Sequence, residues 1–394
     1  MEVKKLKECC TIIAGQSPES KYYNSNGDGL PFFQGKADFG ELYPSIRVYC
    51  SQPTKIAEKD DILLSVRAPV GPTNLAPCKV CIGRGLTAIR PSEVLLTRYV
   101  LLFFRYFEAQ LASKGTGTTF KAITQDVVKN LEIPIPPLPE QERIVSRIEE
   151  LFSQLDAGVE TLKKAKAQLA VYRQAVLKEA FNSAEVDCKM LLIAEILTKT
   201  RKGMSTGPFG TMIKKSDHKA TGVPMLGIEN IGRGQFVDGN KIYVTAEKAE
   251  ELKAFSLRAG DIIISRSGTV GEICAVPERA EGSLLSTNLM RVSLDNTMIR
   301  SDYFIALFQS KGIVLDQIKE LCKGSTRDFL NQTILKRIVF PVPSMEKQEE
   351  IVSIIEARMS VCDSIEQTVD IALQQAEVMR QSILKDAFEG RLLE

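Results

Sequence analysis

The sequence predicts an α+β protein in which two similar mixed α/β domains are joined by two long helices. The helices are expected to pack as an antiparallel coiled coil, with pseudo-two-fold symmetry between the halves. Three observations predict this fold: a long internal repeat, a heptad pattern in each copy, and strand-like runs between polar loops. We expect domains at residues 1–139 and 184–344, and helices at residues 140–183 and 345–394.

The internal repeat is clearest in the helical segments. Residues 141–181 align with residues 348–388 without a gap, and 19 of these 41 positions are identical. The offset of 207 residues falls to 200 where residues 61–71 match 261–271, and to 193 where residues 29–31 match 222–224. A repeat of this length indicates two large units rather than a solenoid of short repeats. The helices have stayed alike, whereas the domains have diverged and taken insertions.

Each long helix carries a narrow apolar seam of the heptad type. In the first helix one row of the seam comprises Ile148, Leu155, Leu162, Leu169 and Val176, which are seven residues apart. A second row, three residues further along, includes Leu151 and Tyr172. In the second helix the first row comprises Ile355, Cys362, Val369, Ala376 and Ile383, and the second row includes Ile365 and Met379. Such a helix is not stable alone, so we expect the two to pack on each other. The alternative is that each helix lies flat on its own domain.

Outside the helices, short strand-like runs alternate with polar loops. Residues 61–65 and 261–265 are apolar, β-leaning runs, and each is followed by a loop that contains glycine. Residues 99–111 and 303–318 instead have apolar side chains at helical spacing. Each domain is therefore expected to be mixed α and β with prominent loops.

The net charge of +2 conceals an uneven distribution. Residues 140–181 carry seven basic and seven acidic side chains, and residues 346–394 carry five basic and eleven acidic ones. The rest of the chain therefore has a net charge of +8. Positive charge concentrated in the domains favours a polyanionic partner such as nucleic acid.

The loops of both domains are rich in side chains that bind phosphates and base edges. The candidate DNA-binding residues of the first domain are Gln16, Ser17, Lys21, Tyr22, Gln34, Lys36, Arg67, Arg84, Lys114, Thr116, Thr118 and Lys121. Those of the second are Lys202, Ser205, Thr206, Lys214, Lys215, Asn230, Arg233, Arg266, Ser267, Thr269, Lys323, Ser325, Thr326 and Arg327. The alternative is that these loops are merely solvated. The recurrence of a Lys-Gly-Ser/Thr loop in both halves favours DNA contact.

No motif for catalysis or phosphate binding is present in the sequence. There is neither a GxxxxGK[ST] loop nor a GxGxxG loop. The single histidine, His218, lies in a polar stretch, which leaves little basis for a Ser-His-Asp or Cys-His system. Cys78 and Cys81 form one CxxC pair, but a zinc site needs about four ligands and no second pair follows. We expect no catalytic residue and no metal on this chain.

Compartment and solubility are also constrained by the sequence. The nine cysteines have no regular spacing, which is typical of buried thiols in a reducing compartment. No apolar run reaches the ~18 residues of a membrane span, and the first residues lack the apolar core of a signal peptide. We expect a cytoplasmic protein.

Four motifs together resemble the specificity subunits of Type I restriction–modification systems. Residues 134–145, Pro-Ile-Pro-Pro-Leu-Pro-Glu-Gln-Glu-Arg-Ile-Val, open the first helix. Residues 341–351 repeat this pattern before the second helix, with Pro-Val-Pro and then Gln-Glu-Glu-Ile. The strand and loop at residues 261–271 and the Ala-Phe-Glu-Gly-Arg-Leu ending at residues 387–392 also match the family. The resemblance covers almost the whole chain.

The resemblance implies two target-recognition domains, each followed by a conserved helical region. Each domain would read one half of a bipartite target in double-stranded DNA, and the helices would set the unread spacer. At 1.5 Å per residue each helix spans about 60 Å, which is compatible with half-sites about one DNA turn apart.

The resemblance further implies a non-catalytic subunit that works with partners. Two methyltransferase (modification) subunits would bind it, and restriction subunits would complete the complex. S-adenosylmethionine, ATP and Mg are then expected on the partner subunits only, with no cofactor on this chain. The alternative function is a coiled-coil scaffold or adaptor that does not read DNA sequence.

Overall fold

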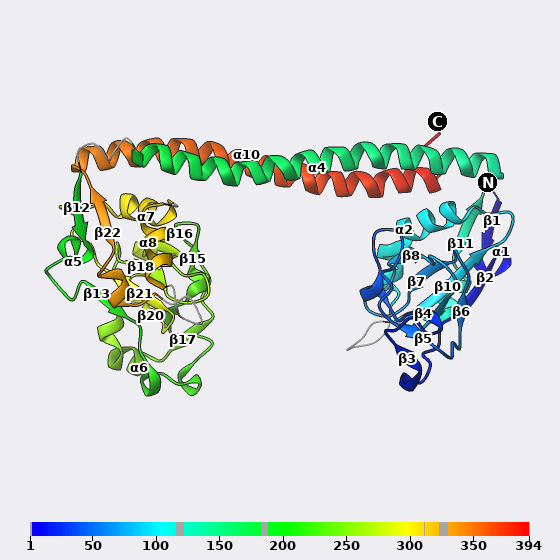
Figure 1. Cartoon of the computed structure of the whole chain (residues 1–394), viewed down its shortest axis with the longest axis horizontal. Helices are drawn as coiled ribbons and strands as arrows, with labels where there is room; N and C mark the ends of the chain where they lie inside the picture. The colour runs from blue at the N-terminus through cyan, green and yellow to red at the C-terminus, as the bar shows by residue number, and fades with distance from the viewer. Residues whose placement is uncertain (1, 116–121, 183–187, 311, 323–329, 394) are drawn as a thin grey trace. The chain divides into compact units, whose positions relative to one another are not determined.

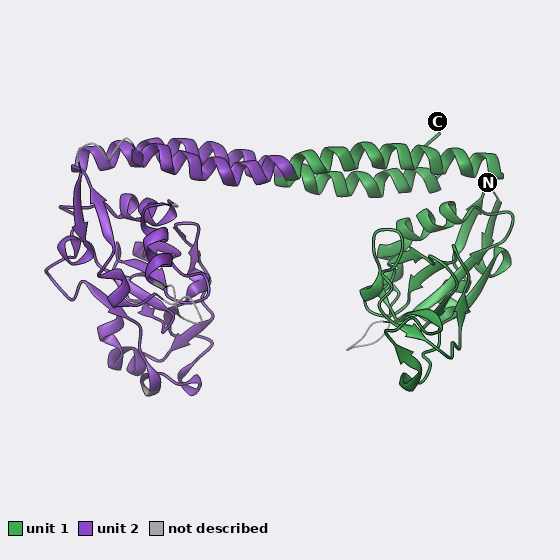
Figure 2. Cartoon of the chain, viewed as in Figure 1, with its two compact units in different colours: residues 1–163, 370–394 green, residues 164–369 purple. Residues whose placement is uncertain are grey.

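The structure is a computed structural model. It describes residues 2–115, 122–182, 188–310, 312–322 and 330–393, apart from the side chains of Thr211 and Cys322. The chain divides into two compact units, Met1–Lys163 with Asp370–Glu394 and Lys164–Val369 (Figure 2). Each unit holds one globular domain, part of the first long helix, α4 (Leu138–Asn182), and part of the second, α10 (Met345–Phe388).

The domain of unit 1 begins and ends on one strand pair, in which β1 (Glu2–Lys5) runs antiparallel to β11 (Glu132–Ile135). Its four-stranded sheet has the order β2-β10-β7-β8, formed by Cys10–Ala14, Leu86–Pro91, Ile62–Ser65 and Thr73–Leu75. A five-stranded sheet has the order β3-β5-β4-β9-β6, formed by Tyr23–Asn24, Tyr49–Cys50, Leu30–Phe33, Val80–Ile82 and Ile56–Ala57. The helices are α1 (Leu6–Cys9), α2 (Thr97–Ser113) and α3 (Gln125–Lys129), with short turns η1 (Ser20–Tyr22) and η2 (Lys36–Asp38) (Figure 1).

The domain of unit 2 also begins and ends on one strand pair, β12 (Lys189–Leu192) with β22 (Val339–Val342). Its four-stranded sheet has the order β13-β21-β18-β19, formed by Met204–Thr206, Leu289–Val292, Ile262–Ser265 and Ile273–Ala275. Two smaller sheets follow, β17-β14-β20 (Ile242–Val244, Val223–Leu226, Leu284–Leu285) and β15-β16 (Ile231–Gly232, Gln235–Phe236). The helices are α5 (Ile193–Ile196), α6 (Ala246–Glu251), α7 (Ser301–Gln309), α8 (Val314–Cys322) and α9 (Gln332–Leu335), with turns η4 (Gly210–Met212), η5 (Lys215–Asp217), η6 (Ile228–Asn230), η7 (Lys253–Phe255) and η8 (Glu278–Ala280).

The two domains share the topology of their four-stranded sheet and of one parallel strand pair, which agrees with the offsets found in the sequence. The four-stranded sheets have the same strand order, and β7 precedes β18 by 200 residues. The parallel pair β4–β9 corresponds to β14–β20, and β4 precedes β14 by 193 residues. All four residues of β7 and of β18 are buried, because an apolar run at the centre of a sheet is covered on both faces.

Each domain core extends into the long helices. In unit 1, Tyr99 and Phe103 of α2 pack on Phe388 of α10, with ring centroids 5.1 and 5.5 Å apart. In unit 2, Phe181 of α4 packs on Tyr303 of α7 at 5.6 Å. Phe181 and Phe388 are repeat equivalents, so each domain buries the last turn of one helix and the first turns of the other. The helices therefore pack on both the domains and each other, which combines the two arrangements weighed from the sequence.

Within each unit the helix segments run antiparallel. In unit 2, Arg173 of α4 donates to Asp363 of α10 at 2.6 Å, and Glu179 accepts from Arg358 at 2.5 Å. A higher residue number on α4 is thus paired with a lower residue number on α10, as in an antiparallel pair. The repeat equivalent of the first pair recurs in unit 1, where Arg380 of α10 bonds Asp156 of α4. The predicted antiparallel packing is confirmed within each unit, and so is the repetition of a domain followed by a long helix.

One row of the predicted seam was wrong. The heptad row from Ile148 to Val176 and its counterpart from Ile355 to Ile383 are buried or half-buried, as expected. Tyr172, Ile365 and Met379, however, are 50%, 44% and 52% exposed, and Leu151 is half-buried beside a groove. The second contact row lies four residues after the first, at Phe152, Val159, Lys166 and Arg173 on α4 and at Met359, Glu366, Leu373 and Arg380 on α10, all half-buried. The row was misassigned because half of its members are charged, and these charges form ion pairs across the two helices.

Two helix ends refine the expectations further. The expected helix at residues 303–318 is two helices, α7 and α8, separated near Gly312, whose φ of +101° interrupts a helix. The second long helix ends earlier than the expected residue 394: Gly390, at φ +84°, follows the end of α10, with Arg391 N donating to Asp386 O at 2.8 Å in a Schellman arrangement. No helix in the described part of the chain combines the length and apolar character that a membrane span requires.

Candidate nucleic-acid interface

A buried glutamine fixes each domain to the start of a long helix. Gln141 Nε2 donates to the carbonyls of Val94 and Pro136, each at 2.8 Å, and its Oε1 accepts from Leu96 N at 2.9 Å. Gln348 makes the same three bonds to Met298, Pro343 and Arg300 in unit 2. Both side chains are 0% exposed. The Glu-Gln motif of the sequence is therefore a joint that orients the loops of a domain relative to its helix.

In the first domain, three loops that follow strands converge at one place. Gln16 N bonds Ile82 O at 3.0 Å, and Arg84 N bonds Ser17 Oγ at 3.2 Å. A Cβ on Gly15 would collide with the carbonyl oxygen of Gly83, and one on Gly85 would collide with that of Gln34. The loops at residues 15–17, 34–36 and 83–85 thus pack backbone to backbone, which leaves the Gln16, Gln34, Lys36 and Arg84 side chains exposed.

The second domain assembles its loops at the equivalent place. A Cβ on Gly207 would collide with Ser286 O, just as one on Gly15 would with Gly83 O. Ser286 N bonds Leu226 O at 3.1 Å, and Gly227 N bonds Asn230 Oδ1 at 2.9 Å. The loops at residues 207–209, 227–230 and 286–288 therefore converge as in the first domain, but they carry different side chains.

A hollow of about 160 Å³ lies among these loops of the second domain. Ile213, Met225, Ile228 and Ile242 form its apolar part, and His218, Glu229, Ser286, Thr287 and Asn288 its polar part. Ser286 Oγ is buried and has no hydrogen-bond partner among the described residues. Sequence reasoning missed these five polar residues, because only the fold brings residues 218, 229 and 286–288 together.

The sequence-predicted residues fall into three groups by exposure. Twelve are exposed: Gln16, Lys21, Gln34, Lys36, Arg67, Arg84, Lys114, Lys202, Lys214, Lys215, Arg233 and Thr269. Ser17, Tyr22, Thr206 and Ser267 are half-buried, and Ser205, Asn230 and Arg266 are buried. Thr116, Thr118, Lys121, Lys323, Ser325, Thr326 and Arg327 lie outside the described residues. The first group is accessible to DNA without rearrangement.

The three buried residues brace the loops instead of facing solvent. Arg266 is 4% exposed, and its guanidinium donates to Leu330 O and Thr287 O, each at 3.2 Å, while it lies 5.5 Å from the Phe209 ring. Burial lowers the pKa of Arg266. Asn230 Nδ2 donates to the carbonyls of Val237 and Gly239 at 3.0 and 3.1 Å, and Ser205 Oγ donates to Thr206 O at 3.2 Å. Direct DNA contact by these three side chains, expected from the sequence, is contradicted by their burial.

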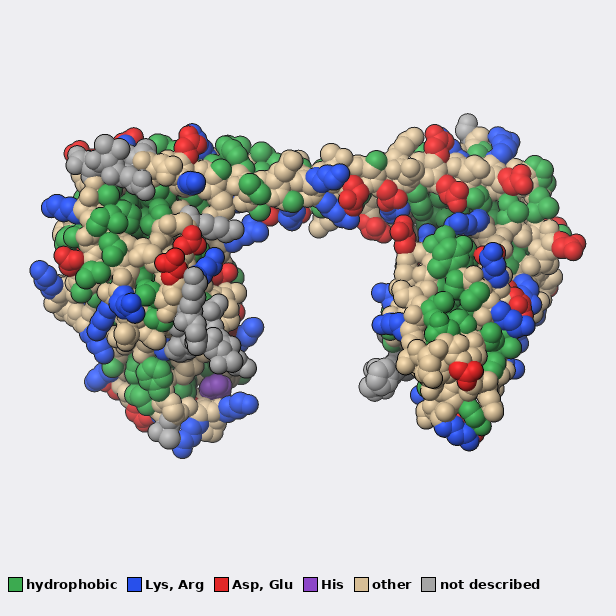
Figure 3. Space-filling view, in the orientation of Figure 1, with side chains coloured by type: hydrophobic (Ala, Val, Ile, Leu, Met, Phe, Trp, Pro, Cys, Tyr) green, Lys and Arg blue, Asp and Glu red, His purple; other side chains and the backbone are tan. Residues whose placement is uncertain are grey.

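Other predicted residues lie away from the converging loops or already have partners. Lys21 pairs with Glu19 at 2.6 Å and lies 4.9 Å from the Tyr22 ring. Arg233 pairs with Glu366 of α10 at 2.9 Å, so its side chain points toward the helix pair. Lys and Arg side chains are spread over the visible surface of both domains, and Asp and Glu side chains gather along the visible face of the helices (Figure 3). This distribution agrees with the charge separation in the sequence.

Comparison with known proteins identifies the family. The sequence profile of the Type I restriction modification DNA specificity domain matches residues 1–169 and again residues 207–375. The chain belongs to this family. The two matched stretches reproduce the duplication: the first includes the first domain and most of α4, and the second begins after β13 and includes the rest of the second domain and most of α10.

Named relatives of the specificity family agree with this assignment. The putative type I restriction enzyme MjaX specificity subunit of Methanocaldococcus jannaschii is 40% identical over 167 residues, which are 42% of this chain and 38% of that protein. The type I restriction enzyme EcoKI specificity subunit of Escherichia coli is 26% identical over 340 residues, which are 80% of this chain and 70% of that protein. The alignment to MjaX thus spans less than half of that relative.

A solved structure has the same fold over nearly the whole chain. It comes from work on complex assembly and conformational transition of the type I R-M system. The TM-score is 0.76 at 18% identity, and the match covers 99% of this chain and 98% of that one. At this identity the likeness concerns the fold, which is the duplicated arrangement of domains and helices described above.

Proposed function

We propose that this chain is the non-catalytic DNA-reading subunit of a Type I restriction–modification complex. Each domain reads one half of a bipartite target in double-stranded DNA, and the helices set the length of the unread spacer. One observation carries the proposal: two domains with the same four-stranded sheet and the same glutamine joint bring equivalent loops together, yet these loops present different side chains. A duplicated frame with unlike loops suits a target whose halves differ.

Exposed and half-buried loop side chains have the chemistry for reading bases. In the first domain, Arg84 can bond guanine O6 and N7, and Gln16 or Gln34 can bond adenine N6 and N7. In the second domain, Asn288 can bond adenine in the same way, and Glu229 can accept from the amino group of cytosine. Lys36, Lys214 and Lys215 suit the phosphates, which position the protein without specifying sequence.

Exposed apolar side chains on the helices support the recruitment of modification subunits. In unit 1, Val378 and Met379 are exposed beside a groove of about 340 Å³ between α4 and α10. The groove is lined mainly by apolar and small side chains, among them Leu155, Gly158 and Ala376. In unit 2 the repeat equivalents of Val378 and Met379, which are Val171 and Tyr172, are also exposed. Two equivalent apolar patches suit two copies of one partner.

The chemistry of the complex then belongs to the partners. Methyl transfer with S-adenosylmethionine would take place on the modification subunits, and ATP-dependent cleavage with Mg on the restriction subunits. This division is supported by the absence of a catalytic motif from the sequence and by the relatives, which are named specificity subunits.

The test is a map of methylated adenines after co-expression of this chain with a cognate modification subunit. We expect a bipartite motif with a fixed spacer. Arg84→Ala should change or weaken only one half of the motif, and Asn288→Ala only the other, because the residues lie in different domains. A single Arg-to-guanine contact contributes about 1–3 kcal/mol of discrimination.

Two results would count against the proposal. A methylome without a bipartite motif would favour the scaffold or adaptor function. A change in both half-sites from either single substitution would contradict the assignment of one half to each domain. Gln168→Ala, at an exposed position of α4, is a matched control that should leave the motif intact.

A further inference from the structure

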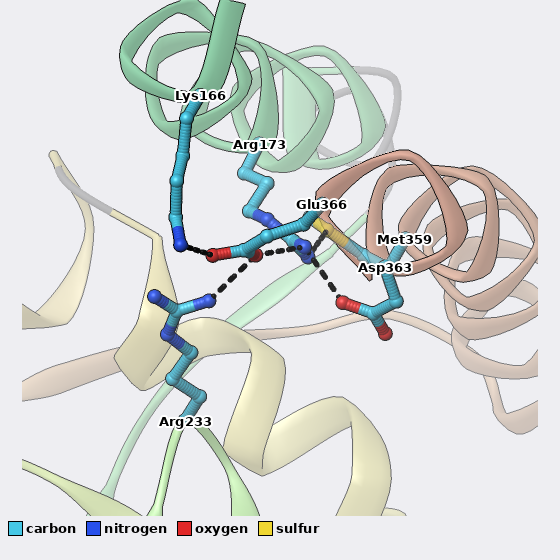
Figure 4. A network of polar contacts seen from close by, with 6 residues as sticks. All are labelled: Lys166, Arg173, Arg233, Met359, Asp363 and Glu366. Carbon is cyan, nitrogen blue, oxygen red and sulfur yellow. Dashed lines mark hydrogen bonds and ion pairs between the residues drawn. The ribbon is translucent and has the colours of Figure 1, made fainter. Parts of the chain in front are cut away.

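A cluster of charges joins the second domain to the helix pair within unit 2 (Figure 4). Glu366 of α10 is at its centre. Its Oε2 accepts from Arg233 Nη1 at 2.9 Å and from Arg173 Nη2 at 3.0 Å, and its Oε1 lies 3.8 Å from Lys166 Nζ. Arg173 also donates to Asp363 and lies 3.7 Å from Met359 Sδ. Two carboxylates thus face three cations, of which two come from α4 and one from the domain.

Arg233 reaches the helices from a tight hairpin. It occupies the turn between β15 and β16, with φ +34° at Arg233 and +83° at Gly234. A Cβ on Gly234 would meet the Gln309 side chain of α7, so the turn lies against that helix. From this place the guanidinium of Arg233 reaches Glu366.

The environment of Glu366 makes this contact stronger than an ordinary surface pair. The Glu366 side chain is 18% exposed, whereas that of Arg233 is 78% exposed. The hydrogen bond from Arg233 and the charges of Arg233 and Arg173 hold the pKa of Glu366 below its usual value, although burial opposes this. The carboxylate is thus ionised and has a domain cation as one of its partners.

The duplication shows what Glu366 adds. Arg173, Asp363 and Met359 have counterparts in unit 1 at Arg380, Asp156 and Phe152, and there Arg380 bonds Asp156 and lies 4.9 Å from the Phe152 ring. Glu366 and Lys166, in contrast, correspond to Val159 and Leu373. The β15–β16 sheet has no counterpart among the described strands of unit 1. Helix pairing therefore does not need a carboxylate at this position.

We propose that Glu366 is a positioning residue that holds the second domain, through Arg233, at a fixed angle on the helix pair. The proposal rests on the DNA-reading function above, and it deepens that function by assigning spacer selectivity to a particular contact. The domain is otherwise joined to α10 through β22 and the Gln348 joint, which lie at its helix-proximal strand pair. Without the Arg233 contact, the domain rocks on that joint, and the second half-site is accepted at more than one distance.

The first experiment compares methylomes of the complete modification complex carrying Glu366→Gln or Glu356→Gln. For Glu366→Gln we expect both half-sites to keep their bases, while methylation at spacers one base pair longer or shorter rises about fivefold, the scale of one ion pair near a surface. Glu356→Gln, which makes the same change at an exposed position of α10, should leave the spacer selectivity unchanged.

A double-mutant cycle separates positioning from DNA contact by Arg233. If the ion pair acts as a unit, Arg233→Gln relaxes the spacer as much as Glu366→Gln, and the double variant relaxes it no further. Arg233→Lys, which keeps the charge, should restore much of the selectivity. An Arg233→Gln variant that lowers DNA affinity and its salt dependence, while Glu366→Gln has no effect, would assign Arg233 to a phosphate instead and overturn the proposal.

Hydrogen exchange on the full chain tests the contact independently of DNA reading. Amides of residues 231–236 should exchange several-fold faster in Glu366→Gln and at the normal rate in Glu356→Gln, with thermal unfolding of both checked by circular dichroism. Three results for Glu366→Gln would each overturn the proposal. They are an exchange rate and a spacer that both stay as in the wild type, a change in the bases of a half-site, and failure to bind modification subunits. A wild-type methylome without any bipartite motif would contradict the proposed function, whereas the exchange result would still report on the contact.

Discussion

Single buried amides decide how each domain meets its helix. Gln141 and Gln348 satisfy three backbone groups each, and all three lie in segments that the chain must bring together: the strand end before the helix and the loop before α2 or α7. The short Glu-Gln signature is thus explained by a requirement of backbone hydrogen bonding. Its glutamine cannot be replaced by glutamate without placing an acceptor where the amide donates twice.

Replacement of either glutamine should destabilise its own unit. Gln141→Ala or Gln348→Ala leaves one buried N–H and two carbonyls without their partner, which should lower the free energy of unfolding by about 2–4 kcal/mol. Denaturant unfolding followed by circular dichroism measures this. Gln168→Ala, at an exposed site of α4, should change it by less than about 0.5 kcal/mol. Equal effects of the buried and exposed substitutions would refute the role of the joint.

At the scale of elements, the helix pair combines apolar ends with a partly charged middle. The apolar row and the aromatic contacts stabilise the ends, where each helix enters a domain core. Between them, charged members of the second row form ion pairs across the helices. Partner choice and register in such a pair depend on these polar contacts more than on the apolar row.

The ion pairs of unit 2 predict acid sensitivity of its helix segments. The pKa of Glu179 is lowered by its hydrogen bond and charge interaction with Arg358, and that of Glu366 by Arg233. Because these pKa values are lower in the folded state, the stabilisation is complete above the ordinary value of 4.5 and is lost as pH falls through the folded pKa. The free energy of unfolding can be measured by urea titration between about pH 7 and about pH 3. For a Glu179→Gln/Glu366→Gln double variant it should be lower than that of the wild type at neutral pH, and it should fall less as the pH is lowered.

Salt provides the control for this pH dependence. At about 0.5 M salt the difference between the wild type and the double variant should shrink near neutral pH, because exposed pairs are screened. A double variant whose stability falls with acid as steeply as that of the wild type would show that these carboxylates do not cause the effect.

The exposed apolar patches predict the number of partners bound. Tyr172→Glu or Met379→Glu places a charge in one of the two patches, so each single variant should bind one modification subunit fewer and the double variant none. Native mass spectrometry of the reconstituted complex measures the stoichiometry. Thr161→Glu and Thr368→Glu, at exposed polar repeat-equivalent positions, are the controls. Two modification subunits bound to both single variants would place the docking surface elsewhere.

For the whole molecule, the proposed function makes the helices the ruler of the target. One heptad inserted after Ala165 and another after its repeat equivalent, Ala372, should lengthen each helix by about 10 Å while keeping its seam. The spacer of the methylated motif should then grow by about three base pairs, at 3.4 Å per base pair along each strand, and both half-sites should stay the same. An altered half-site would contradict the proposal that the helices set the spacer length. An unchanged spacer in a complex that still methylates DNA would contradict it as well.

Much of the architecture followed from the sequence. The gap-free repeat at residues 141–181 and 348–388 determined two long helices, and the offsets of 200 and 193 placed equivalent strands that the structure confirms at β7 with β18 and β4 with β14. Loop composition also located the exposed candidates, such as Arg84 and Lys36. These features are local or periodic, and local propensity and period are carried by neighbouring residues.

Only the tertiary structure decided which of these residues face a partner, the solvent or the interior. Rows three and four residues after an apolar position are equally near on a helix, so the sequence alone did not show that Arg173 and Glu366, and not Tyr172 and Ile365, lie in the helix contact. Arg266 is buried by carbonyls 21 and 64 residues away, and Arg233 meets a carboxylate 133 residues away. Such contacts depend on how distant segments pack, and no local pattern encodes that packing.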